Sequence, residues 1–196
     1  DMFSVTGYFK KLKSPIEQTQ ESSGGTVIRS FRNAEDGIAT GVEIEFRKEL
    51  FKNLRIGANG SYMYTNVILP EGGVYTDSER ALQGASPFLI NADISYTPQL
   101  RGESDLTLAL VYNVQGPRIE TVGIYGTGNI KQQTLHTMDF IASYAINKHL
   151  NLRLQMKDLL NSTIRFKQEL PATGQKVEVE SFRPGTNAEI GVSYRF

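Results

Sequence analysis

The sequence contains no cysteine, no tryptophan and no surplus of charge of either sign. Without cysteine a disulfide framework is excluded, although the compartment stays open. Lys plus Arg and Asp plus Glu each number 21, which argues against a nucleic-acid partner, because neutralising phosphates takes a basic surplus. The two histidines, His136 and His149, give no metal-ligand spacing, and no cofactor-binding fingerprint occurs, so neither a metal nor a cofactor is expected.

Long hydrophobic runs are also missing. No stretch of 18 apolar residues occurs, so the sequence predicts no transmembrane helix. A membrane-crossing β-strand shows an apolar side chain to lipid only at every second position, and its signal is therefore lost in a window average. The negative mean hydropathy of the chain consequently does not decide between a water-soluble and a membrane protein.

What the sequence does contain is alternation. In the last nine residues the apolar side chains Ala188, Ile190, Val192, Tyr194 and Phe196 share one parity and the polar side chains share the other. A period of two is typical of a β-strand with one apolar and one polar face. Similar segments recur along the chain, and from Ile38 onward their apolar positions are predominantly even-numbered. The expected strands cover 3–9 (continuing toward residue 20 through an interruption at Pro15), 26–46 (with a break at Gly37), 54–65, 88–97, 106–114, 138–146, 150–157 and 188–196, with a turn at 21–25.

The connections between these segments alternate in length. Short turns are expected around residues 50, 101 and 148, and long loops over 67–86, 115–135 and 161–183. Short periplasmic turns and long extracellular loops are typical of outer-membrane barrels. The pattern therefore predicts an all-β fold, an antiparallel transmembrane β-barrel. A soluble sandwich with the apolar row inside remains the alternative, and tyrosines near the strand ends favour the membrane interpretation.

Several segments resemble the sequence landmarks of TonB-dependent outer-membrane receptors of the kind common in Bacteroidetes. They are 41–46, Arg80 with 82–91, 112–113, 116–119 with 122–123, and 158–161. The resemblance implies a 22-stranded barrel with an amino-terminal plug. Residues 1–196 would supply about eight carboxy-terminal strands of that single barrel domain, and the plug would be absent from this chain.

The resemblance also implies a function. Such a receptor is an active importer of a scarce solute in the bacterial outer membrane, and it is not an enzyme. Its partners would be the remaining strands and plug, the TonB complex reached through the missing amino-terminal part, outer-membrane lipid and a surface lipoprotein. The transported substrate, whether siderophore, glycan, peptide or cobalamin, is not specified by the residues.

Candidate ligand contacts lie in the long loops, which gather solute in receptors of this type. Tyr75, Arg80, Arg118 and Tyr125 combine aromatic area or charge with hydrogen-bonding reach. Two other functions stay open at this point: a passive or structural outer-membrane barrel, and an outer-wall hydrolase. The hydrolase would use His136 and Ser162. In a hairpin that turns at Lys148, paired residues have numbers that sum to about 296, and His136 and Ser162 would then be diagonal neighbours on adjacent strands.

The charged residues at the polar positions of the strands indicate whether these strands alone could close into a barrel. A closed barrel of eight strands has an interior just wide enough to be filled by side chains, and it would confine many charged residues in a dry bore at a high desolvation cost. We therefore expect the first strand (3–9) and the last strand (188–196) to leave unpaired edges within this chain. The charged residues concerned are Glu43, Glu45, Arg47, Arg55, Asp93, Asp139, Arg153, Lys157 and Glu189.

Overall fold

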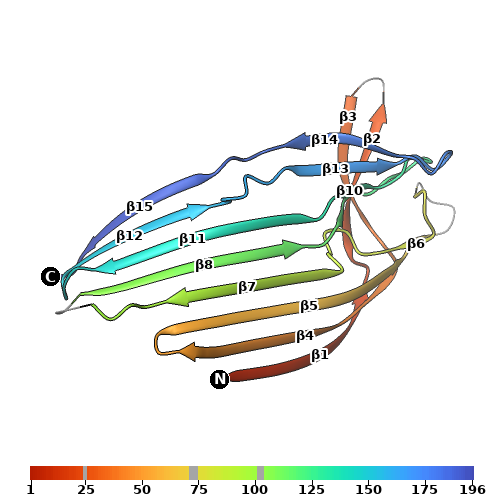
Figure 1. The fold of residues 1–196 in the computed structure, drawn as a ribbon. Helices are drawn as coiled ribbons and strands as arrows, with labels where there is room; N and C mark the ends of the chain where they lie inside the picture. Colours follow the sequence, from red (N-terminus) through yellow and green to blue (C-terminus); the bar gives the residue numbers. More distant parts are fainter. Residues whose placement is uncertain (24–25, 71–74, 101–103) are drawn as a thin grey trace.

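A single antiparallel sheet of long strands, here called the wall, dominates the computed structural model, which describes residues 1–23, 26–70, 75–100 and 104–196 (Figure 1). Eight strands follow one another in the order β1-β4-β5-β7-β8-β11-β12-β15. Their bounds are β1 Met2–Lys13, β4 Asp36–Phe51, β5 Leu54–Ile68, β7 Phe88–Tyr96, β8 Asp105–Gln115, β11 Leu135–Ala145, β12 Leu150–Lys157 and β15 Asn187–Tyr194. The predicted all-β antiparallel class and the expected set of strands are confirmed.

Short and long connections alternate along the wall as predicted. Between β4 and β5 the chain reverses at Lys52 and Asn53, and Asn53 adopts a left-handed conformation with φ of 68°. Between β11 and β12 the side-chain oxygen of Asn147 accepts hydrogen bonds from the amides of His149 and Leu150, both at 2.9 Å. The third short connection, expected around residue 101, lies outside the described residues.

Strand register keeps the apolar side chains of the wall on one face. Directly opposite residues of an antiparallel pair lie on the same face, and Phe140 pairs with Met156, which agrees with the predicted sum of 296. In β1 the parity is inverted, since Phe3 pairs with Phe46 and therefore shares a face with it. We call this face the apolar row and the opposite face, which carries most of the charges, the charged row.

Tyrosines border the apolar row at both ends. Tyr96, Tyr144 and Tyr194 lie near the short turns, whereas Tyr62, Tyr64 and Tyr112 lie near the long connections. Tyr96 pairs with Leu54, and Tyr62 lies eight residues further along β5, which is about 27 Å along the strand. At a strand tilt of 35–45° this distance is about 20 Å across a membrane, comparable with the roughly 25 Å apolar band of outer-membrane barrels.

The long connections contain further strands, and of these the sequence predicted only the strand that begins at Thr26. Strands β2 (Ile16–Ser23) and β3 (Thr26–Asn33) pair with each other, and β6 (Glu79–Arg80) pairs with β5. Another sheet has the order β14-β13-β10-β9, and its strands are β9 Arg118–Thr121, β10 Ile130–Gln132, β13 Ile164–Glu169 and β14 Lys176–Phe182. We call these elements and the segments between them the cap. In Figure 1 they gather at the end of the wall away from both termini.

The first strand does not continue toward residue 20 as expected. β1 ends at Lys13, Ser14 has a left-handed φ of 49°, and β2 begins at Ile16 in a separate sheet. Pro15 follows that reversal, and its ring fixes φ and removes a backbone donor, which suits a break between two strands. The carbonyl of Pro15 instead accepts a hydrogen bond of 2.9 Å from Ala34, at the far end of the β2–β3 hairpin.

Both edges of the wall are open. β1 and β15 stand at opposite ends of the strand order, and within the described part of the chain neither pairs with a further strand on its outer side. The expected unpaired edges are therefore confirmed. No helix among the described residues is long and apolar enough to cross a membrane.

The two faces of the wall should report different surroundings. We expect a spin label at Leu108, on the apolar row, to be relaxed by a lipid-soluble quencher, and a label at Thr107, on the charged row, by a water-soluble one. The measurement is made on the full-length protein in lipid vesicles. The reverse accessibility would mean that the charged row faces lipid.

Arginine substitutions on β12 test depth as well as face. Leu154 pairs with Ala142 and Ile190, well away from the tyrosines, whereas Leu152 pairs with Tyr144 at the short-turn end. We expect Leu154→Arg to lower the free energy of folding into vesicles by about 2–4 kcal/mol and Leu152→Arg by less, since the cost falls near the interface. Gln155→Arg, on the charged row, is the matched control and should be nearly silent; equal effects at residues 154 and 155 would contradict the assignment.

Candidate functional site

The buried core of the described chain lies in the cap and at the end of the wall beneath it. A single-layer sheet has no second layer to pack against, so its side chains stay accessible on both faces. The segments folded against the charged row at the cap end, by contrast, bury side chains together. The buried apolar residues are Ala34, Ala39, Val67, Leu69, Ile119, Val122 and Ile124, and the buried polar ones are Glu17, Thr19, Thr65, Arg80, Ser86 and Gln132.

A buried ion pair joins two of the long connections. The guanidinium of Arg80 donates two hydrogen bonds to the carboxylate of Glu17, at 3.1 and 2.7 Å. The side chains of Arg80 and Glu17 are 5% and 0% exposed. A two-pronged contact of this kind fixes orientation as well as distance. Since the charges are removed from water, either of them left alone would be strongly unfavourable.

Tyr75 completes the surroundings of this pair. Its ring lies 5.6 Å from the Arg80 guanidinium carbon, and its hydroxyl donates to the carbonyl of Asn33 at 3.4 Å. Burial and then the nearby Glu17 carboxylate raise the pKa of Tyr75, while Arg80 and Arg32 oppose that shift. The phenol therefore stays protonated at neutral pH and remains a donor. A bridge between Tyr75 and Ile124 ties the same segment to the next long connection.

Gln83 links three long connections by its amide. Its oxygen accepts from the amide of Gln18 at 2.6 Å, and its nitrogen donates to the carbonyls of Gln18 and Glu120 at 3.1 and 2.7 Å. Thr19 also forms a parallel bridge with Val122. The cap is therefore one hydrogen-bonded unit and not a set of independent loops.

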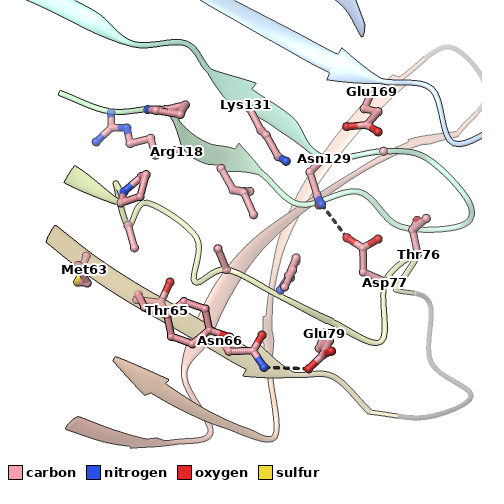
Figure 2. Close-up of a pocket in the computed structure, with 18 of the residues that line it drawn as sticks. Met63, Thr65, Asn66, Thr76, Asp77, Glu79, Arg118, Asn129, Lys131 and Glu169 are labelled. Atoms are coloured by element: carbon pink, nitrogen blue, oxygen red, sulfur yellow. Dashed lines mark hydrogen bonds between the residues drawn. The ribbon is translucent and has the colours of Figure 1, made fainter. Parts of the chain in front are cut away.

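A cavity of about 750 Å³, here called the notch, opens where β7 stops short of β5. Tyr62 is the last residue of β5 that pairs with β7, opposite Phe88, but β5 continues to Ile68. β9 and β10 lie across the gap that this leaves. Figure 2 shows Met63, Thr65 and Asn66 on one side of the notch and Arg118, Asn129 and Lys131 on the other. The volume lies within the range of small-molecule sites.

Carboxylate and amide side chains face each other in pairs around the notch. The Asn66 amide donates to Glu79 at 2.8 Å, and the Asn129 amide donates to Asp77 at 2.7 Å (Figure 2). Each pair keeps further acceptor positions on its oxygens and a second amide hydrogen. The notch is therefore lined by groups that can both donate and accept hydrogen bonds.

The predicted ligand-contact residues fall into different surroundings. Arg80 and Tyr75 meet in the cap, where Arg80 is committed to Glu17. Arg118 lines the notch, its Nε donates to the Gln132 side chain at 2.9 Å, and its terminal nitrogen lies 3.7 Å from a carboxylate oxygen of Glu120. Tyr125 is 66% exposed with a left-handed φ of 53°, at a turn directly after Ile124, the bridge partner of Tyr75.

His136 and Ser162, the two residues considered for hydrolase chemistry, are in contact, but their side chains do not bond to each other. The hydroxyl of Ser162 donates to the main-chain carbonyl of His136. The imidazole of His136 bonds instead with the hydroxyl of Tyr112, at 2.7 Å. In this arrangement the serine hydroxyl points its proton at the backbone and not at a base.

Several residues of the cap and the notch escaped the sequence reasoning. Glu17 lies 63 residues from Arg80, and no local spacing relates them. Asp77 and Asn129 are 52 residues apart. Strand alternation could have identified Glu79, because it is the neighbour of Arg80 in the sequence and its side chain must point to the opposite face.

These features define a class: a single-layer antiparallel wall with one apolar face, tyrosines bordering that face at both ends, and long connections gathered at one end. The model of the outer membrane protein β-barrel family matches residues 2–194. The chain belongs to this family, and its location is the bacterial outer membrane. No curated protein and no solved structure matches the chain.

Removing one member of the buried ion pair should loosen the cap. We expect Arg80→Met to lower the local opening free energy of the β2–β3 hairpin by about 3–5 kcal/mol, because Glu17 is left buried and unpaired. Hydrogen exchange of the hairpin amides in the full-length protein measures this. The double variant Arg80→Met with Glu17→Leu should recover most of the protection, and unchanged exchange in the single variant would mean that the pair does not hold the cap.

Proposed function

We propose that the chain is part of the wall of a TonB-dependent receptor, of the kind common in Bacteroidetes, which imports a scarce solute actively. The observation that carries the proposal is the open wall with charges along one face. The unpaired N–H and C=O groups at the two edges need further strands as hydrogen-bond partners in a membrane. The remaining strands of a larger, 22-stranded barrel would supply them, and the plug would lie inside that barrel.

The charged row supports a wide, water-filled lumen. Arg47, Arg55, Arg153 and Lys157 share that face with Glu43, Glu45, Asp93, Asp139 and Glu189. A wide lumen leaves these side chains hydrated, whereas a narrow bore would have to pair nearly all of them. Barrels with many strands enclose such a lumen, and the largest transporters hold a plug inside it.

The cap supports a receptor that handles solute at its outer end. Its segments fold against the charged row and are tied together by Arg80, Tyr75 and Gln83, so they can present a fixed surface to the lumen. In this proposal Arg80 and Tyr75 position the cap, while Arg118 and Tyr125 are the residues of the original set with side chains available to solute. The chain performs no catalysis, and the TonB complex, outer-membrane lipid and a surface lipoprotein are its further partners.

Conductance separates the receptor from a passive barrel. We expect the full-length protein in a planar bilayer to pass almost no ions until urea displaces a plug, because the lumen would otherwise be blocked. The purified periplasmic domain of TonB should bind the same preparation. A steady conductance without urea, together with no TonB binding, would identify a passive pore and contradict the proposal.

A further inference from the structure

We propose that the notch is a binding site for the saccharide headgroup of an outer-leaflet glycolipid. The inference depends on the orientation of the wall, with the apolar row toward lipid. It does not depend on energised transport, since a passive barrel with the same wall would present the same site.

Part of the notch faces the lipid side of the wall. Tyr62, Tyr64 and Asn66 belong to the apolar row of β5, and Glu79 pairs with Ile68 and so shares that face. Arg80, one residue further, pairs with the fully buried Val67 and lies on the opposite side. Met63, Thr65 and Arg80, on that opposite side, also line the notch, so the notch passes through the gap at the edge of β5 and reaches the lipid side between Asn66 and Glu79.

The notch also lies at the depth where headgroups begin. Tyr62 and Tyr64, which are 60% and 53% exposed, form its lower rim and belong to the tyrosine band near the long connections. Tyrosines in such bands mark the boundary between hydrocarbon and headgroups. Because the long connections are extracellular in barrels of this class, the headgroups at this level are those of the outer leaflet.

The lining has the chemistry that recognises sugars. Saccharide hydroxyls donate and accept hydrogen bonds, and the pairs Asn66–Glu79 and Asn129–Asp77 offer both functions on two sides of the notch. Tyrosine rings provide flat apolar area for the C–H faces of a sugar ring. These groups surround a volume of about 750 Å³, large enough for a small-molecule ligand.

A buried donor without a partner marks the same place. Arg80 lines the notch, and its Nε is buried with no hydrogen-bond partner in the described structure. Buried polar atoms almost always have a partner, from the protein or from a bound molecule. A hydroxyl or a bound water in the notch would satisfy this atom, whereas an alkyl chain would not.

Two lysines beside the notch suit the acidic substituents of such headgroups. Lys131, which lines the notch, pairs directly with Lys167 on β13, and like charges in opposed positions repel each other. Among the described residues neither ammonium has a carboxylate within 4 Å. Glu178 lies directly opposite Lys167 on β14, and Glu169 lines the notch with Lys131, both beyond ion-pair distance of the two ammonium groups.

The test is binding to the full-length protein in detergent, measured by native mass spectrometry. The probes are lipid A carrying its inner-core sugars, the same core oligosaccharide without lipid, and phosphatidylglycerol. Glu79→Leu and Asn129→Leu each remove one hydrogen-bonding pair, and we expect each to weaken binding of the glycolipid at least about tenfold. Glu45→Gln on the charged row is the matched control and should bind as the natural chain does, and altered gel mobility after heating shows that each variant is folded.

Three results would overturn the assignment. Unchanged glycolipid binding in both folded leucine variants would remove the notch from the site. Equal affinity for phosphatidylglycerol would mean that sugars are not recognised, and equal affinity for the free oligosaccharide would mean that the occupant is a soluble saccharide. Each result is independent of conductance and TonB binding, so a failure here is distinguishable from a failure of the proposed import function.

Discussion

The structure depends on one constraint, which is that a single-layer sheet in a membrane must satisfy its backbone hydrogen bonds by strand pairing alone. Lipid offers no alternative partner to an N–H or a carbonyl, and each unsatisfied group costs several kcal/mol. The inner strands of the wall meet this condition on both sides, whereas β1 and β15 meet it on one side. The wall is therefore stable in lipid only as part of a closed barrel, and the charged row makes a wide closure far less costly than a narrow one.

The cap is stabilised differently from the wall, because its segments pack against one another outside the lipid. Its stability comes from side chains buried between segments, and the price of burying Glu17 and Arg80 is offset only by their mutual contact and by Tyr75. Buried ion pairs contribute little net stability but penalise every arrangement that separates them. The pair therefore selects one arrangement of the β2–β3 hairpin against the segment between β5 and β7.

The wall was predictable from the sequence to a large extent and the cap was not. Alternation in segments such as 188–196 identifies strands, and tight hairpins fix the register, which is why the pairing of Phe140 with Met156 could be anticipated. The inverted parity of β1 could not be related to β4 in advance, because the long β2–β3 hairpin separates them. In the cap the strands are as short as the three residues of β10, so alternation has no length over which to show itself.

The same limit explains why the functional set was only partly found. Arg80 and Arg118 could be chosen for their chemistry, but burial decides their roles, and burial depends on contacts between segments far apart in the chain. Glu17 reads in the sequence as one more surface acid on a polar strand. In the structure it is 1% exposed.

The early end of β7 connects the ion pair to the notch. Beyond Phe88 the edge of β5 loses its partner, and its groups are satisfied by the returning chain: Met63 donates to the carbonyl of Pro87 at 2.8 Å, and the Thr65 hydroxyl accepts from the amide of Leu82 at 3.1 Å. β6 then pairs Arg80 with Val67 and Glu79 with Ile68. Because successive side chains point to opposite faces, this register sends Arg80 inward to Glu17 and Glu79 outward to Asn66, on two sides of the notch. A slip of one residue would exchange the two, placing a carboxylate beside Glu17 and an arginine at the lipid face. A single pairing register thus sets both the closure of the cap and the chemistry of the outer surface.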